Sequence, residues 1–371
     1  LLNSGEESYF DLPIRSDSTA SLYEHCVRAI EHGLRFGEKG LPLMGSGDWN
    51  DGMDKVGNHG KGESVWLAFF LYDILVKFAD VAAIKNDEAF VTKCRDQAEQ
   101  LKQNIQKNAW DGEWYRRAYF DDGTPLGSHE NEECKIDSIA QSWSVLSNAA
   151  DEQRSIMAMK NADQFLVQQE DGMIQLFTPP FDKSSMNPGY IKGYVPGVRE
   201  NGGQYTHAAI WLVMAFAAIG DNKRTWELLQ MINPLNRGNT AEKMGVYKAE
   251  PYVVAADVYA EPMHKGRGGW TWYTGSAGWM YQLVLESFVG LKKEGHKIFF
   301  TPCLPAEWPL VKISYRNNNR LYQVEIVQQG GEEKSTWKLL VDGVEQTGMH
   351  FLLEPEVIEE NSSALKLPVA E

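Results

Sequence analysis

The period of the hydrophobic pattern changes near residue 291, and this change constrains the fold more strongly than any other feature. Before it, apolar side chains recur every three or four positions, as in residues 22–34, which is typical of amphipathic helices. After Lys297, apolar and polar residues alternate, which is typical of short strands separated by turns. We therefore predict a helical domain over residues 1–291 and a small antiparallel β-domain over residues 296–371.

The helical region contains eight predicted helices, several in adjacent pairs, joined by long loops rich in Gly, Pro and aromatic residues. Long ordered loops on a helical scaffold are commonly functional. The helices are expected after a cap at Ser16-Asp17-Ser18, from Phe90 to Ile105, and from near Glu63, Asp137, Glu152, Gly203, Asn222 and Thr274. The strands are expected at 298–300, 311–315, 322–327 and 337–341.

Composition indicates a globular chain whose ligands are not polyanions. Hydrophobic residues make up 43% of the 371 residues and charged residues 23%, so the chain can bury a substantial core. The formal net charge is −15 and Lys and Arg form no run, which disfavours nucleic acids and anionic membrane surfaces as partners. Neutral sugars carry no charge and are compatible with this acidic surface.

The cysteines favour a reducing compartment. Cys26, Cys94, Cys134 and Cys303 show neither metal-ligand nor redox spacing, so we interpret them as free thiols and place the protein in the cytoplasm. No apolar run approaches the roughly 18 residues that span a bilayer, so no membrane segment is predicted in this chain. Clustered His and Cys ligands, a nucleophile elbow and a dinucleotide-binding motif are also absent from the sequence.

Residues 45–52, Gly-Ser-Gly-Asp-Trp-Asn-Asp-Gly, carry the strongest chemical signal. Asp48 and Asp51 flank Trp49 and Asn50, with glycines on both sides that let the backbone approach a ligand. An aromatic face suits the apolar side of a sugar ring, and a carboxyl group against an aromatic wall keeps its proton to higher pH. A proton donor beside a sugar is what cleavage of a glycosidic bond requires. The alternative is an ordinary Asx-turn loop with a buried Trp.

Three further loops stand apart from the scaffold. Residues 110–117 look like a hairpin in which Trp and Tyr alternate with charges, and a purely structural turn is the alternative. Residues 196–207 supply Arg, Glu, Gln and His ahead of an apolar helix, which suits an anion or a sugar, although a lone His is often structural. Residues 265–278 bring glycines, two cations and hydroxyls to a helix start, which can hold a phosphate or simply pack two Trp side chains.

Together these loops resemble the inverting disaccharide and oligosaccharide phosphorylases of glycoside hydrolase family 94. Within that family they are most similar to the carboxy-terminal region of cyclic β-1,2-glucan synthases and to 1,2-β-oligoglucan phosphorylases. The likeness runs over nearly the whole chain. Its most specific stretches are Gly47–Met53, Gly60–Trp66, Ile136–Trp143, Arg199–His207, Glu250–Val253 and Gly268–Gly275.

The resemblance implies a mainly α fold, an (α/α)6 toroid followed by a carboxy-terminal β-domain. Family members carry a donor-site Arg and Asp upstream of the Trp-Asn-Asp motif, and the 48 residues before Trp49 hold no matching segment. An (α/α)6 toroid has twelve helices, and only eight are predicted here, which also indicates that part of the toroid is missing. We therefore expect the toroid to be incomplete at its amino-terminal side and the chain to be the later part of a longer protein.

The resemblance also implies roles for individual residues. Asp51 takes the place of the general acid, and Trp49 lines the donor sugar site. The phosphate-binding set is His207, Thr274, Gly275 and Arg267. Further substrate contacts are expected from Asp48, Asn50, Glu200, Gln204 and Tyr252. No cofactor and no metal are implied, because inorganic phosphate is the co-substrate.

The reaction implied is inverting transfer of a glucosyl unit between a β-linked glucan, β-1,2 by resemblance, and phosphate, which gives α-glucose 1-phosphate. Two alternatives stay open. One is an inverting hydrolase on the same scaffold, with Glu200 or Asp137 as the base that activates water. The other is a non-catalytic module that holds glucan and sets product length in a larger, membrane-bound cyclic β-1,2-glucan synthase.

Overall fold

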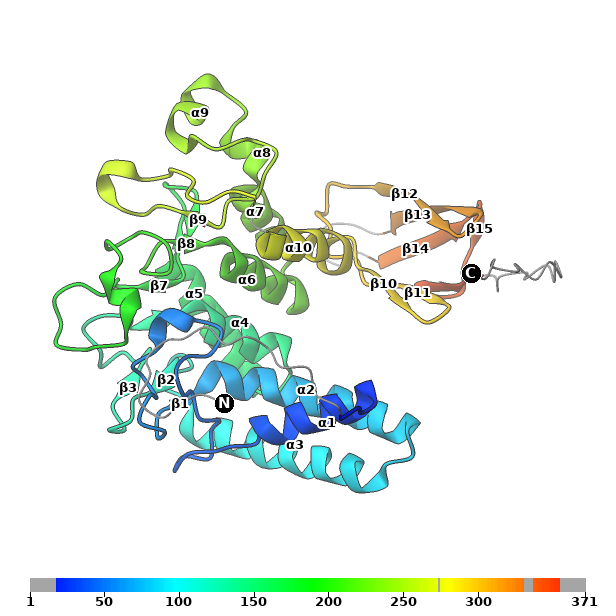
Figure 1. The fold of residues 1–371 in the computed structure, drawn as a ribbon. Coiled ribbons are helices and arrows are strands. Elements are labelled where there is room, and N and C mark those ends of the chain that lie inside the picture. Colours follow the sequence, from blue (N-terminus) through cyan, green and yellow to red (C-terminus); the bar gives the residue numbers. More distant parts are fainter. Residues whose placement is uncertain (1–17, 273, 330–335, 354–371) are drawn as a thin grey trace, which may run out of the picture.

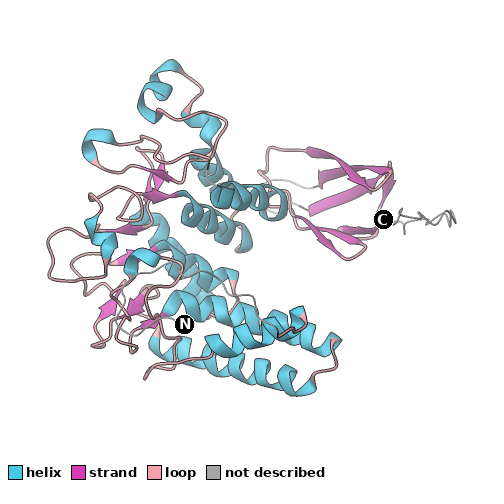
Figure 2. Ribbon diagram, viewed as in Figure 1, coloured by secondary structure: helices cyan, strands magenta, loops and turns pink. Residues whose placement is uncertain are grey.

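The structure, a computed structural model, describes residues 18–272, 274–329 and 336–353. All eight predicted helices lie within these ranges, and the helix-rich part is followed by antiparallel sheets, as the predicted fold class requires (Figures 1 and 2). The eight helices are α1 (Leu22–Gly33), α2 (Val65–Ile84), α3 (Glu88–Asn108), α4 (Ser138–Leu146), α5 (Glu152–Leu166), α6 (Thr206–Ala218), α7 (Asn222–Ile232) and α10 (Thr274–Gln282). The sequence did not predict two short helices, α8 (Pro234–Arg237) and α9 (Ala241–Tyr247).

Side-chain caps explain where the helices begin. Ser64 Oγ accepts a hydrogen bond from Leu67 N at 2.9 Å at the start of α2, and Asp137 caps α4 in the same way. The predicted cap of the first helix was wrong, because Ser21 accepts from the backbone of Glu24 instead. Ser16 and Asp17 lie outside the described residues.

The helices pack in a regular alternation. Helix α2 contacts α3 and α4, α4 contacts α5 and α6, and α6 contacts α7 and α10. Almost every residue of α4 and most of α6 are buried, which is expected of helices surrounded by neighbours. None of the helices in the described part of the chain is long and apolar enough to cross a membrane.

Short strands gather with the long loops at one end of the helices (Figure 2). The strands β1 (Glu63–Ser64), β4 (Ile136–Asp137) and β8 (Gln204–Tyr205) directly precede α2, α4 and α6, so these three helices begin on the same side. Strand β1 pairs with β2 (Ala118–Tyr119), β4 with β7 (Phe177–Thr178) and β8 with β9 (Asp257–Val258). Strand β2 also pairs with β3 (Pro125–Leu126), and β5 (Val167–Gln168) pairs with β6 (Met173–Ile174).

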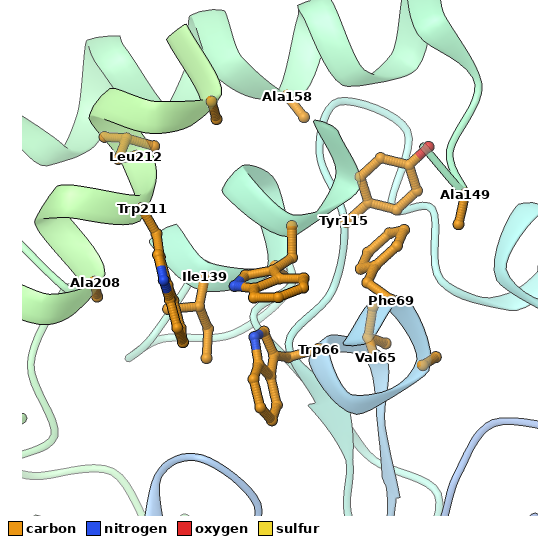
Figure 3. Close-up of a cluster of buried hydrophobic side chains, with 14 of the residues drawn as sticks. Val65, Trp66, Phe69, Tyr115, Ile139, Ala149, Ala158, Ala208, Trp211 and Leu212 are labelled. Atoms are coloured by element: carbon orange, nitrogen blue, oxygen red, sulfur yellow. The ribbon is translucent and has the colours of Figure 1, made fainter. Parts of the chain in front are cut away.

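Indole rings join the three central helices in the core (Figure 3). Trp66 of α2 and Trp211 of α6 are stacked with ring centroids 6.2 Å apart. Trp143 of α4 meets both edge-on, at 6.0 Å from Trp66 and 5.2 Å from Trp211. Aromatic pairs in this geometry stabilise a core beyond the area they bury.

The carboxy-terminal strands form two antiparallel sheets with a core of their own around Ile298, Phe300 and Val324. The four predicted strands are confirmed as β11 (Lys297–Phe300), β12 (Leu310–Asn317), β13 (Arg320–Gln329) and β14 (Thr336–Val341). Three further strands, β10 (Leu291–Glu294), β15 (Val344–Glu345) and β16 (His350–Leu352), were not predicted because they are short and mostly exposed. The division into domains at 291 and 296 stays a prediction that the separate core supports, and residues 354–371 lie outside the described part.

Arg117 ties the loop of residues 45–52 to the beginnings of two helices. Its side chain is completely buried, and its two terminal nitrogens donate to the two carboxylate oxygens of Asp48 at 2.6 and 2.7 Å. Ser64, the cap of α2, donates to the same carboxylate at 2.6 Å. The Nε of Arg117 lies 3.5 Å from Oδ2 of Asp137, the cap of α4.

The pKa values of the two carboxyl groups around Arg117 shift in opposite directions. Burial raises the pKa of Asp48, but the Arg117 charge and several hydrogen bonds outweigh burial and hold this pKa below its usual value. Burial raises the pKa of Asp137 to about 6, because Arg117 offsets the cost only in part. Asp48 therefore keeps its negative charge opposite Arg117 in mildly acidic solution, where Asp137 already takes up a proton.

Asp48→Asn should lower the free energy of unfolding by about 3–5 kcal/mol at pH 7, because the buried Arg117 cation loses the carboxylate that both of its terminal nitrogens contact. Asp73→Asn is the matched control, since its ion pair with Lys77 is exposed and contributes about 0.3–0.5 kcal/mol. Urea unfolding monitored by Trp fluorescence measures both. The effect of Asp48→Asn should shrink as pH falls below about 4, because the unfolded chain then takes up a proton at Asp48 that the folded chain, with its lowered pKa, takes up only at still lower pH. Equal losses in the two variants would contradict the structural role of the pair.

Gly290→Ala should destabilise the connection between the helical part and β10. Gly290 has φ +80°, and an added Cβ would lie 2.2 Å from the carbonyl of Thr301. Gly295→Ala is the control, because φ is +57° there but no atom lies within 4 Å of the new Cβ. We expect the first variant to lose about 1–3 kcal/mol more than the second in urea unfolding, since only it adds steric overlap to left-handed strain. Similar losses in both variants would argue against this close approach.

Candidate functional site

The two carboxyl groups in the loop of residues 45–52 point in different directions. Asp48 turns inward to Arg117, and its Oδ1 also accepts from the backbone of Asn50 at 3.0 Å. Asn50 is buried and caps the 3₁₀ turn Asp51–Met53, because its Oδ1 accepts from Gly52 N at 3.0 Å. Asp51 stands at the first position of that turn with its side chain exposed. The local hydrogen bonds thus leave one carboxyl group for chemistry and use the other for structure.

A second loop provides a tyrosine beside Asp51. Tyr190, in the 3₁₀ turn Tyr190–Gly193, forms a side-chain hydrogen bond to Asp51, and burial together with this bond raises the pKa of the Tyr190 phenol. Its backbone N donates to Asp54 Oδ1 at 3.0 Å, which fixes the two loops together. The sequence analysis missed Tyr190, because only the fold brings residues 54 and 190 together.

Trp49 connects the Asp51 loop to the loop that was predicted to bind phosphate. Its ring centroid lies 5.5 Å from Tyr205, 5.4 Å from His207 and 5.4 Å from Trp211. The first two contacts are edge-to-face, a favoured geometry for aromatic pairs. The structure therefore brings together two segments more than 150 residues apart that the sequence analysis had assigned to one site.

His207 lies within an aromatic enclosure at the start of α6. Its ring centroid is 4.3 Å from Trp211 and 5.6 Å from Trp279 of α10. Burial lowers the pKa of His207 to about 4, so the imidazole is neutral near pH 7. Its Nε2 is buried and has no hydrogen-bond partner, and such an atom usually has one.

The helix that carries Trp279 also contains two predicted phosphate ligands. Thr274 and Gly275 form the first turn of α10, and a Cβ at Gly275 would meet no atom within 4 Å. The side chain of Thr274 lies outside what the structure describes. Ser276, in the same turn, is buried and its Oγ has no partner. Arg267 lies in a different segment, after the 3₁₀ turn Pro262–His264, and its side chain is exposed.

Glu200 lies next to an arginine that stacks on aromatic rings. Glu200 is buried, and its Oε2 lies 3.3 Å from the Nε of Arg199. The Arg199 guanidinium lies between the rings of Tyr194 and Trp270, 4.8 and 4.2 Å from their centroids. Arg199 has φ +52°, and its N donates to Asp257 at 3.0 Å.

The remaining predicted residues are dispersed. Gln204 is 1% exposed, and its Oε1 accepts from Ile174 N at 3.1 Å, which is a structural contact. Tyr252 is 70% exposed, on a surface loop beside Trp272. Asp137, one candidate base of the hydrolase alternative, is 1% exposed behind Arg117 and therefore cannot reach a water molecule at the sugar.

Within the described ranges, no group of three or more His, Cys, Asp and Glu side chains could hold a metal ion. The structure adds Arg117, Tyr190, Tyr194 and Trp279 to the neighbourhood of the predicted residues. Only Arg117 left a signal in the sequence, as a charge in the predicted hairpin of residues 110–117.

Curated relatives include phosphorylases and a glucan synthase. Cyclic beta-(1,2)-glucan synthase NdvB of Rhizobium meliloti (strain 1021) is 47% identical over 326 residues, which make up 88% of this chain and 12% of that protein. Solabiose phosphorylase of Paenibacillus borealis is 30% identical over 344 residues, 92% of this chain and 44% of the relative. 1,2-beta-oligoglucan phosphorylase of Listeria innocua is 27% identical over 162 residues, 40% of this chain and 14% of the relative. The chain thus spans less than half the length of these relatives.

A solved structure described as a sialidase matches with a TM-score of 0.59 over 87% of this chain and 29% of that chain. Its sequence identity is 13%, so this similarity concerns the fold alone. The profile of the glycosyl hydrolase 94 superfamily catalytic domain matches residues 1–290, and the family resemblance of the loops is confirmed. Because this match covers well over half of the chain, the protein belongs to the glycosyl hydrolase 94 superfamily.

Proposed function

We propose that this chain carries the catalytic region of an inverting phosphorylase that transfers a glucosyl unit between a β-glucan and inorganic phosphate. One observation carries the proposal. Trp49 packs on His207, so the exposed Asp51 carboxyl and a neutral histidine with an unpartnered buried nitrogen belong to one site. A proton donor and an anion-binding group on either side of a sugar are what phosphorolysis requires.

The roles follow from the placement of the groups. Asp51 donates its proton to the glycosidic oxygen as the C1–O bond breaks, and Tyr190 orients the Asp51 carboxyl through their hydrogen bond. A phosphate oxygen forms the new bond to C1 from the opposite face, so a β-linkage gives α-glucose 1-phosphate. His207, the first turn of α10 with Thr274 and Gly275, and Arg267 hold the phosphate. Phosphate is already a nucleophile, so a second protein carboxylate is not needed.

The substrate contacts divide into direct and indirect ones. Trp49 and Glu200 lie at the site and face the sugar in this proposal. Asp48, Asn50 and Gln204 are buried and act by fixing the backbone of the two loops. No cofactor takes part, since phosphate is the co-substrate. The hydrolase alternative retains only Glu200 as a base, and its carboxylate already faces Arg199.

The finer assignments rest on similarity. A β-1,2 linkage is favoured because the relative that is 47% identical is described as a cyclic beta-(1,2)-glucan synthase. The four cysteines are free thiols, which favours a cytoplasmic location, and the parent polypeptide is a soluble phosphorylase or the cytoplasmic part of a membrane-bound synthase. An (α/α)6 toroid is supported by the alternation in which α2 contacts α4, α4 contacts α6, and each of the three has a further neighbour, α3, α5 or α7.

The full-length protein should release α-glucose 1-phosphate from β-1,2-glucooligosaccharides only when phosphate is present. Asp51→Asn should lower kcat by about 10²–10⁴-fold, because the amide cannot donate the proton that the leaving oxygen needs. Asp80→Asn, on the exposed face of α2, should leave kcat unchanged. Product release is measured enzymatically, with and without phosphate.

Free glucose appearing without phosphate would identify a hydrolase instead, and oxygen from labelled water would then enter the product. If Asp51→Asn left both turnover and product distribution unchanged, the chain would be a glucan-holding module rather than a catalytic region.

The His207 imidazole should titrate near pH 4 in NMR spectra without phosphate, because burial disfavours its charged form. Added phosphate should raise this midpoint, since a bound anion stabilises the imidazolium. His207→Gln identifies the resonance by removing it. The same depressed pKa predicts that folding stability falls as pH drops from about 6.5 towards 4, because the unfolded chain then binds a proton that the folded chain does not. A midpoint that phosphate leaves unchanged would remove His207 from the phosphate site.

A further inference from the structure

Three large aromatic side chains are exposed together on two adjoining loops. Tyr252 is 70% exposed, Trp270 51% and Trp272 68%. The rings of Tyr252 and Trp272 lie 6.3 Å apart at an angle of 68°. We call these three residues the aromatic platform. Exposed apolar groups that lie together usually mark a binding surface, whereas single ones need no explanation.

The platform is held in position at an energetic cost. Trp272 has φ +65°, a left-handed conformation that is unusual for a bulky side chain. Its Nε1 donates to Glu250 Oε1 at 3.3 Å, which anchors the indole while its ring remains exposed. Strained backbone of this kind is concentrated at functional sites, because it costs stability and persists only where the surrounding structure holds it in place.

A continuous row of side chains connects the platform to Asp51. Trp270 stacks on Arg199, with the guanidinium 4.2 Å from the ring centroid. Arg199 also lies over the ring of Tyr194, and Tyr194 meets Tyr190 at 6.1 Å. Tyr190 in turn is hydrogen-bonded to Asp51. The platform is therefore the outer end of the wall on which the catalytic carboxyl lies.

The chemistry of this wall fits a neutral polyhydroxyl chain. Aromatic faces accept the apolar side of a sugar ring, and the neighbouring Glu250 and Arg199 offer an acceptor and donors to its hydroxyls. The net charge of −15 disfavours an acidic polymer on the same surface. One sugar at the Asp51 site cannot also cover the platform, because Arg199, Tyr194 and Tyr190 lie between them.

We propose that Tyr252, Trp270 and Trp272 bind sugar units of a long glucan beyond the bond that is cleaved, and so favour long chains over short ones. This inference rests on the proposed function, and it names chain length as the property that the site selects. Short substrates occupy only the Asp51 end of the wall. Long substrates also bind the platform, which lowers their KM.

The test compares Trp272→Ala and Tyr252→Ala with the wild type on a β-1,2-linked disaccharide or trisaccharide and on β-1,2-glucan chains of ten or more units. We expect kcat/KM for the long chains to fall about tenfold, through KM, while the short substrates change less than twofold. Leu352→Ala is the control, because Leu352 is also 70% exposed but lies on β16. An equal loss on both lengths, or no loss on either, would overturn the proposal.

A binding measurement separates this inference from the proposed function. In native gels that contain β-1,2-glucan, the wild type should be retarded and Trp272→Ala should migrate faster than the wild type. If no substrate gave phosphate-dependent turnover, the proposed reaction would fail, but a loss of retardation in Trp272→Ala would still support the platform. Retardation that is the same in the variant and the wild type would overturn it.

Discussion

The orientation of the Asp51 loop depends on the buried ion pair between Arg117 and Asp48. A buried charge is costly unless it is paired and hydrogen-bonded, and here both terminal nitrogens of Arg117 meet both oxygens of Asp48. Ser64 and Asp137, the caps of α2 and α4, surround the same guanidinium. The loop is therefore fixed to the scaffold at the start of two core helices. This explains how a segment rich in glycine can hold a carboxyl group in one place.

Burial has opposite consequences on the two sides of the site. It keeps His207 uncharged, because no carboxylate compensates the loss of solvent around the imidazole. Asp48 is buried as well, but it stays ionised because the charge of Arg117 more than offsets the loss of solvent. The indoles that surround His207 also belong to the core that joins α2, α4 and α6, so the phosphate side of the site is part of the packing that stabilises the fold (Figure 3).

Hydrophobic period predicted the eight main helices and four of the strands, because these segments are long enough to show it. It missed α8, α9 and the two-residue strands, because each of them spans fewer than two full periods and so shows no repeat. The motifs predicted Asp51, Trp49 and His207 as one site, and contacts between Trp49 and His207 agree with that grouping. The same motifs gave no reason to distinguish Gln204, which is buried, from Tyr252, which is exposed.

The sequence by itself determined the family, the helical and strand regions, and the residue types available for acid chemistry and anion binding. Local signals suffice for these, because periodicity, caps and motif spacing act over a few residues. Only the tertiary structure decided which of the two loop carboxylates turns inward, since the partner of Asp48 is Arg117, 69 residues away. It also placed Tyr190 on Asp51 and Trp270 on Arg199. These contacts arise from the packing of distant loops, which no local pattern encodes.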